Sequence, residues 1–324
     1  MPEPHVYAIP LTTRFRGIEV REGLLLRGEA GWGEFSPFLE YDDPTALPWW
    51  RAAREAADLG WPDPVRSRIP VNVTVPACSP ERAREIVLAS NGCRTAKVKV
   101  AEPGQRLADD QARLEAVRDA LGPAGLVRID ANGGWSVDAA VSAIPVLDRA
   151  AGGLEYVEQP SPEVEDLAAV RRRVDVPVAA DESIRRAEDP YRVRDLDAAD
   201  IAVLKVQPLG GVRACLRIAE DIGLPVVVSS ALETSVGIAA GVALAAALPQ
   251  LDHACGLATV QLLAGDVAVE PLLPVDGHLP VQRPDVDPGR LAGLAAPADR
   301  AAYWRARLAA VEALAQSLGQ DQTS

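Results

Sequence analysis

The chain has 324 residues, of which 48% are hydrophobic and 24% charged, a balance typical of globular proteins and too apolar for a disordered chain. Its formal net charge of −13 disfavours nucleic acid or an anionic membrane as a partner, because both bind basic surfaces. No apolar run approaches the roughly 20 residues of a membrane-spanning helix. The four cysteines lie far apart and no export signal is visible, so a reducing cytoplasm is the expected location.

The first 67 residues are predicted to form one part of an α+β accessory domain. They contain β-like segments at 17–20 and 23–28, a loop rich in glycine and aromatic residues at 31–38, and a helical pattern at 45–59.

From about residue 70, short β-type runs alternate with helix-like stretches. The runs are 70–75, 95–100, 125–130, 156–158, 176–181, 201–205, 225–229 and, more weakly, 253–256. The clearest helical stretches are 80–89, 108–120, 137–150 and 211–222, and the apolar run 236–248 is expected to be a buried helix. Alternation at this spacing predicts parallel βαβ units, and eight runs favour a barrel over an open sheet, although periodicity alone does not separate the two.

The tail beyond about residue 265 returns to turn-rich sequence with many prolines and ends in a helical pattern at 299–318. We expect it to join the first segment. The predicted organisation is therefore an accessory domain built from 1–67 and 265–324 beside a barrel at 68–264.

Ionisable or hydroxyl side chains recur at the carboxyl ends of the predicted strands. The intervals from Lys99 to Asp130 and from Asp130 to Glu158 are 31 and 28 residues, and the strand ends from Glu158 to Gly256 are 23 to 27 residues apart. In a barrel these ends converge on one face, where active sites are built. A surface charge pattern has no reason to follow the strand repeat. The intervals therefore predict one polar cluster at the barrel mouth.

Three of these strand ends carry carboxylates: Asp130, Glu158 and Asp181. Acids that converge without a counter-charge repel one another, so at least one should bind a proton or a cation. Oxygen ligands without nearby cysteine or histidine select a hard cation such as Mg²⁺, with Mn²⁺ also possible. Each acid taken alone is more simply a helix cap or turn residue. Their regular spacing favours the metal site.

Lysine is scarce in this chain. Of 33 basic residues only Lys97, Lys99 and Lys205 are lysines, and all three fall on strands that flank the three acids. Arginine is effectively always protonated, whereas lysine can lose its proton, so retained lysines are candidates for proton transfer. Three surface lysines left by chance are the alternative. A nearby metal and desolvation are expected to lower the lysine pKa, which suits a base that removes a proton beside a carboxylate.

At this point the residues resemble a known family. The resemblance lies in the segments Lys97-Val98-Lys99, Asp130-Ala131-Asn132, Glu158-Gln159-Pro160, Asp181-Glu182-Ser183, and Lys205 with Gly210-Gly211. Together they resemble the enolase superfamily, muconate-lactonising-enzyme subgroup, which uses a lysine or histidine base with Mg²⁺. The resemblance implies an α/β fold with a (β/α)7β TIM-like barrel and an α+β capping domain formed by both chain ends.

Within that subgroup the segments 33–38, 229–237 and 263–266 are most similar to the o-succinylbenzoate synthase family of the actinobacterial kind. That family dehydrates 2-succinyl-6-hydroxy-2,4-cyclohexadiene-1-carboxylate to 2-succinylbenzoate, a step toward menaquinone. The resemblance implies that Lys99 is the base and that Lys97 holds the substrate carboxylate and tunes Lys99. It also implies that Lys205 stabilises the enediolate by cation–π attraction.

The same resemblance assigns the remaining residues. Asp130, Glu158 and Asp181 are expected to bind Mg²⁺, and Asn132 and Glu182 to orient these ligands and Lys205. Ser229, Ser230 and Thr234 are expected to meet the succinyl arm of the substrate, with the N-terminus of a helix near Thr234 offered to an anion. A simple helix cap at Thr234 is the alternative. The loop around Arg14, Arg16 and Gly17 is expected either to close over the substrate or to carry solvated charge.

Other functions remain open at this point. An N-succinylamino acid racemase or another epimerase would use the same metal, with Lys99 and Lys205 as opposed acid and base. A muconate cycloisomerase is disfavoured, and a non-catalytic binding protein would require the polar set to be inert. The sequence leaves the oligomeric state open.

Overall fold

The computed structural model describes residues 3–15, 17–185 and 190–321. Arg16, named above as a candidate for the loop over the substrate, lies outside the described residues, and so does the side chain of Arg14. The expected contact of this loop with substrate therefore stays a prediction.

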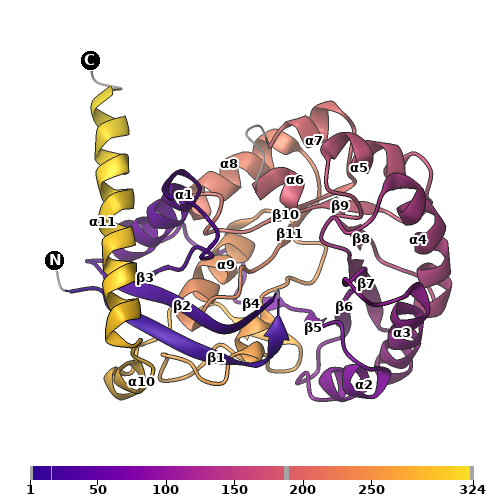
Figure 1. Cartoon of the computed structure of the whole chain (residues 1–324), viewed down its shortest axis with the longest axis horizontal. Helices are drawn as coiled ribbons and strands as arrows, with labels where there is room; N and C mark the ends of the chain where they lie inside the picture. The colour runs from indigo at the N-terminus through magenta and orange to yellow at the C-terminus, as the bar shows by residue number, and fades with distance from the viewer. Residues whose placement is uncertain (1–2, 16, 186–189, 322–324) are drawn as a thin grey trace.

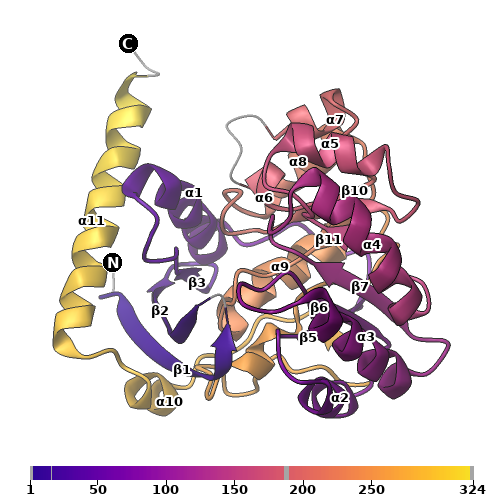
Figure 2. The ribbon, with the colours of Figure 1, turned by 45° about the vertical axis from the view of Figure 1, so that its right-hand side comes forward.

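Both chain ends build one α+β layer. Strands β1 (His5–Phe15), β2 (Ile18–Arg27) and β3 (Trp32–Phe35) form an antiparallel sheet in that order. Helix α1 (Asp43–Arg54) and the C-terminal helix α11 (Ala298–Asp321) lie beside it (Figures 1 and 2). A buried cluster that includes Phe35, Trp49 and Trp304 joins sheet and helices. We call β1–β3, α1 and α11 the capping layer.

The larger unit is a curled sheet of seven parallel strands in the order β11-β10-β9-β8-β7-β6-β5. The strands are β5 (Val73–Val75), β6 (Thr95–Lys99), β7 (Leu126–Asp130), β8 (Val157–Glu158), β9 (Val178–Ala180), β10 (Ile201–Leu204) and β11 (Val226–Val228). Parallel bridges from Cys255 to Val71 and from Gly256 to Ser229 link the two edges. The weak eighth run thus closes the sheet into the expected (β/α)7β barrel.

Helices cover the outside of the barrel (Figure 1). They are α2 (Pro80–Leu88), α3 (Leu107–Leu121), α4 (Val137–Ala151), α5 (Val164–Arg171), the short α6 (Glu182–Arg185) and α7 (Arg192–Asp195), α8 (Val212–Ile222) and α9 (Ser235–Ala247). Local sequence explains several starts: the hydroxyls of Ser79 and Ser136 accept the N–H groups of Arg82 and Ala139, which caps α2 and α4. Helix α9 is apolar and nearly all buried, as its sequence predicts.

Two segments differ from the sequence prediction. The run 70–75 is divided: β4 (Arg68–Pro70) pairs antiparallel with β12 (His278–Pro280) outside the barrel, and only β5 joins the parallel sheet. The helix expected at 45–59 is α1 followed by a π-helical turn, Glu55–Leu59. Two short helices, η2 (Ala258–Leu262) and α10 (Pro288–Gly293), lead from the barrel back to the capping layer.

The amino-terminal end of the barrel interior is filled. Tyr156, Ile201, Val203 and Val227 form a buried cluster there, and the fully buried Arg128 donates to the Tyr156 hydroxyl over 2.9 Å and to Ala254 O over 2.8 Å. Polar space in the barrel is therefore confined to the carboxyl ends of the strands. All four cysteines are free. Among the described residues, no helix combines the length and the apolar character needed to cross a bilayer.

Candidate active site

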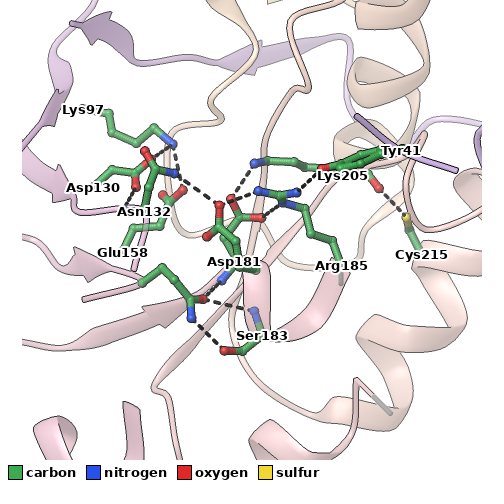
Figure 3. A network of polar contacts seen from close by, with 12 residues as sticks. Tyr41, Lys97, Asp130, Asn132, Glu158, Asp181, Ser183, Arg185, Lys205 and Cys215 are labelled. Carbon is green, nitrogen blue, oxygen red and sulfur yellow. Dashed lines mark hydrogen bonds and ion pairs between the residues drawn. The ribbon is translucent and has the colours of Figure 1, made fainter. Parts of the chain in front are cut away.

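Figure 3 shows Lys97 and Lys205 gathered with the three strand-end carboxylates at the barrel mouth. Lys99 joins them through its contact with Asp130. One cavity there is lined from the barrel by Lys97, Lys99, Asn132, Lys205, Ser229 and Ser230. Phe15 of β1, Trp49 of α1 and Phe38 of the loop between β3 and α1 complete its wall. A larger cavity of about 540 Å³ lies between α2 and the 258–266 segment, and its lining includes none of the three lysines and none of the three strand-end acids. Chemistry, not size, identifies the smaller cavity as the candidate site.

Lys97 lies between two carboxylates. Its Nζ donates to Asp130 Oδ2 over 3.0 Å and to Glu158 Oε1 over 2.8 Å, and its side chain is almost fully buried. Burial alone disfavours the ammonium form, but the charges of Asp130 and Glu158 outweigh it and hold the pKa of Lys97 well above its ordinary value. Lys97 thus compensates two buried acids and keeps its charge, in contrast to the lowered lysine pKa expected beside a metal.

Lys99 is two residues further on β6, so it points to the same face. Its Nζ lies 2.5 Å from Asp130 Oδ2 and 2.6 Å from Asn132 Oδ1, and it stands 5.6 Å from the centre of the Phe15 ring. The two lysines together hold the pKa of the buried Asp130 well below its ordinary value, although desolvation opposes them. Asn132 thus contacts the candidate base directly, closer to the reaction than expected.

Lys205 approaches from the other flank. Its Nζ lies 2.5 Å from Asp181 Oδ2. Desolvation and the nearby Arg185 lower the pKa of Lys205, in agreement with the expectation from sequence. Lys205 therefore shares the cavity with Lys99 but is paired with a different carboxylate.

Arg185 is a site residue that the sequence reasoning missed. Its Nε donates to Asp181 Oδ1 over 2.8 Å, another nitrogen contacts Glu182 Oε1, and a third donates to the Tyr41 hydroxyl over 3.2 Å. It lines the cavity and is nearly buried. The available signal was its place one helical turn after Asp181, since residues four apart share a helix face.

Hydrogen bonds hold the strand-end loops. Asn132 N–H donates to Asp130 Oδ1 over 3.0 Å, and Asn132 Nδ2 donates to Glu182 Oε1 over 3.3 Å. Gln159 Oε1 accepts the Asp181 N–H over 3.0 Å. Asn132 and Gln159 have left-handed backbones, with φ of 47° and 40°. Such strained positions persist where surrounding contacts enforce them and are frequent at functional sites.

Glu158 shows the cost of gathering three acids. Desolvation and the neighbouring Asp130 raise the pKa of Glu158 to about 7. Its Oε2 atom is buried without a hydrogen-bond partner. Glu158 is therefore the acid of the trio whose charged form its surroundings disfavour, and the expectation that one acid binds a proton or a cation stays a prediction.

The acids suit a hard divalent cation in ligand chemistry, because all donors are oxygens and one is a buried, unpartnered carboxylate oxygen. As they stand, however, the described side chains include no group of three acidic, histidine or cysteine residues arranged to hold an ion. Lysines and Arg185 neutralise the carboxylates instead.

The three residues expected to meet the succinyl arm are divided by the fold. Ser229 and Ser230 line the cavity, and Ser230 Oγ lies 2.8 Å from Thr259 Oγ1. Gly256 gives the Ser229 hydroxyl room, since a Cβ at Gly256 would stand 2.6 Å from Ser229 Oγ. Thr234 is fully buried outside the cavity lining; it caps α9, and its hydroxyl donates to Glu34 of the capping layer.

Comparisons with known proteins agree with this architecture. Residues 80–292 match the family model described as enolase C-terminal domain-like, and residues 6–57 match the enolase N-terminal domain-like model. The chain is 68% identical over 307 residues to the o-succinylbenzoate synthase of Thermobifida fusca, covering 95% of both chains. It is 58% identical to that of Mycolicibacterium smegmatis, covering 96% of this chain and 95% of the relative.

Solved structures share the fold. A muconate lactonizing enzyme from Pseudomonas fluorescens complexed with muconolactone matches with a TM-score of 0.76 and 23% identity, over 91% of this chain and 98% of the other. A substrate-liganded L-Ala-D/L-Glu epimerase from Bacillus subtilis matches with a TM-score of 0.74 and 25% identity, over 88% of this chain and 96% of the other. Enzymes of this superfamily depend on divalent metals. The chain belongs to the enolase superfamily and, within it, to the o-succinylbenzoate synthase family.

Proposed function

We propose that this chain dehydrates 2-succinyl-6-hydroxy-2,4-cyclohexadiene-1-carboxylate to 2-succinylbenzoate, the activity expected from its closely similar relatives and a step toward menaquinone. The observation that carries the proposal is the position of Lys99 and Lys205 on two flanks of one cavity, with the carboxylate trio between them. A small carboxylate substrate and a cytoplasmic location belong to the same proposal.

Lys99 is the proposed base. In its neutral form Nζ takes the proton from the carbon beside the ring carboxylate. The C–O bond at the neighbouring ring carbon then breaks with its electron pair, and the hydroxide that leaves, together with the proton taken by Lys99, makes up the water lost in the reaction. The aromatic ring that forms supplies a large driving force. Asn132 Oδ1 and Asp130 Oδ2, each within 2.6 Å of Nζ, fix the direction in which the amine points.

Lys205 acts through its charge. It faces the cavity from β10, where its ammonium group attracts the electron-rich ring system that develops when the proton leaves. Lys97 carries a firmly held positive charge beside Asp130 and Glu158 and helps to bind the substrate carboxylate. Arg185 and Glu182 hold Asp181 and Asn132 in place.

Asp130, Glu158 and Asp181 are the proposed ligands of a divalent cation, Mg²⁺ first and Mn²⁺ as the substitute. Such a cation supplies Lewis acidity, which neutralises the substrate carboxylate and the negative charge that develops on it. Ser229 and Ser230 are proposed to contact the succinyl arm, while Thr234 acts only through its neighbours.

The second candidate activity is racemisation of N-succinylamino acids, because two lysines facing one cavity can act as opposed acid and base. One experiment separates the two. The purified protein with Mg²⁺ is given each substrate in deuterated water, and aromatic absorbance and exchange of the α-hydrogen are followed. We expect rapid aromatic product. Exchange on N-succinylamino acids without aromatic product from the cyclohexadiene would make the racemase the principal activity.

A further inference from the structure

The wall of the cavity formed by residues 229–232 is held from the capping layer. Two charged side chains do this, Glu34 on β3 and Arg21 on β2, and both are nearly fully buried. Neither touches the lysines or the carboxylate trio in any contact described here. They reach across about 200 residues of sequence to the loop between β11 and α9.

Glu34 occupies the N-terminus of α9. Its carboxylate accepts the N–H groups of Thr234 and Gly237, each over 3.1 Å, as well as the Thr234 hydroxyl. Tyr7 and Ser36 donate to its other oxygen over 2.7 and 2.8 Å. A carboxylate is stabilised at a helix N-terminus by unpaired N–H groups and by the helix dipole. The helix N-terminus that was expected to face the succinyl arm is thus occupied by the protein's own Glu34.

Gly237 makes the close approach possible. A Cβ at Gly237 would stand 3.0 Å from Glu34 Oε2 and 2.5 Å from Glu233 Cβ, so any other residue would push the carboxylate away. The close contact between β3 and α9 therefore depends on Glu34 in β3 and on Gly237 in α9.

Arg21 holds the loop just before the helix. Its Nε donates to Leu232 O over 2.7 Å, and a terminal nitrogen lies 3.3 Å from Ala231 O. Leu232 lines the cavity with a left-handed backbone, φ 67°, which is costly for leucine. The buried guanidinium offsets this cost by binding the carbonyl that the strained conformation presents.

We infer that Glu34 and Arg21 are positioning residues for substrate binding: they hold the Ser229–Leu232 wall in the conformation that meets the non-reacting arm of the substrate. This rests on the proposed function for the identity of that arm. Contacts that are equally strong in the ground and transition states lower KM without changing kcat. If the wall contacts to this arm are of that kind, their loss raises KM more than it lowers kcat.

The chain offers a matched control. Glu55, like Glu34, is a buried carboxylate of the N-terminal segment that binds the start of a barrel helix. It accepts the N–H of Val212 over 2.6 Å and of Arg213 over 3.2 Å at the start of α8. Glu55 does not line the cavity. If Glu34 has only a structural role, Glu55→Ala and Glu34→Ala should change KM equally.

The test compares Glu34→Ala, Glu34→Gln and Glu55→Ala by steady-state kinetics and by amide hydrogen exchange of the ligand-free proteins. We expect Glu34→Ala to raise KM about tenfold with kcat changed less than threefold, and to speed exchange of the Ala231 and Thr234 amides at least tenfold. Glu34→Gln keeps one acceptor and should fall between Glu34→Ala and the wild type. Glu55→Ala should leave KM and these amides unchanged.

An unchanged KM and unchanged exchange in Glu34→Ala, or an equal rise of KM in Glu55→Ala, overturns the inference. If Glu34→Ala does not fold, Glu34→Gln decides by the same two measurements. Hydrogen exchange needs no substrate, so it still tests the positioning if the wild type does not turn over the cyclohexadiene. Failure of the proposed function and failure of this inference are therefore told apart.

Discussion

Lys99 and Lys205 face one cavity from strands β6 and β10, which are separated in the barrel by β7, β8 and β9. Strands β7 and β8 end at the buried Asp130 and Glu158, and Asp181 directly follows β9. Lys99 is paired with Asp130 and Lys205 with Asp181. A substrate bound in the cavity would therefore meet one amine on either flank.

Replacing Lys99 by alanine should lower kcat at least about a thousandfold, because general-base and electrostatic groups contribute on that scale. Lys99→Arg is the matched variant, since it retains the charge but cannot act as a base near neutral pH. We expect it to be as inactive as Lys99→Ala. Measurable activity of Lys99→Arg near the wild-type rate would show that Lys99 acts through charge alone.

Replacing Lys97 by methionine removes the cation between Asp130 and Glu158. Breaking a buried ion pair on one side costs about 3–5 kcal/mol, so the free energy of unfolding in urea with a chelator should fall by about that amount. Added Mg²⁺ should recover part of the loss. Lys99→Met should cost less, because Asp130 still has Lys97; equal losses in the two variants would contradict this account.

Cation binding should depend on pH through Glu158. Its pKa of about 7 means that the carboxyl carries a proton below pH 7, which a cation must displace. We expect Mg²⁺ affinity, measured by calorimetry, to be constant above about pH 7.5 and to fall up to tenfold per pH unit below 7. Removal of divalent ions by a chelator should abolish turnover. Affinity that is equal at pH 5.5 and pH 8 would exclude this role for Glu158.

Stability should carry a second pH dependence from Glu233. Burial, with the nearby Glu34, raises the pKa of Glu233 from 4.5 to about 7, so the folded chain holds this proton more tightly than the unfolded chain does. The contribution is fully present below about pH 4.5 and is lost as pH rises to 7, a change of up to roughly 3 kcal/mol. Glu233→Gln can still accept the Ala231 N–H and removes the titration. The difference in unfolding free energy between wild type and Glu233→Gln should change over this window; a constant difference would refute the prediction.

Much of the fold could be predicted because it rests on local patterns. Helices α2, α3, α4 and α8 fall within one or two residues of their expected bounds, and the barrel strands lie where β-type runs were expected. The sequence did not indicate that the run 70–75 is divided between two sheets. Pro70 ends β4, which pairs with β12 about 200 residues later in the chain, and no local sequence pattern indicates that partner.

The sequence predicted which residues gather at the site, but it did not predict all of the hydrogen bonds and ion pairs that they form there. One hydrogen-bonded region contains the predicted lysines, the acids and the residues expected to orient them: Lys97, Lys99, Asp130, Asn132, Glu158, Asp181, Glu182 and Lys205. The raised pKa of Lys97 was unexpected, since it depends on two carboxylates from other strands. Arg185 and the partners of Thr234 were missed for the same reason.

The sequence by itself determined the alternating βα units, the strand-end acids and the three lysines, because these follow from the order of residues along the chain, and the carboxyl ends of parallel strands lie at one edge of the sheet. Only the tertiary structure decided that Glu34 fills the N-terminus of α9, that Arg21 holds Leu232, and that Lys97 bridges two acids. These contacts join side chains that are tens to hundreds of residues apart, and their energies depend on burial, which no local pattern encodes.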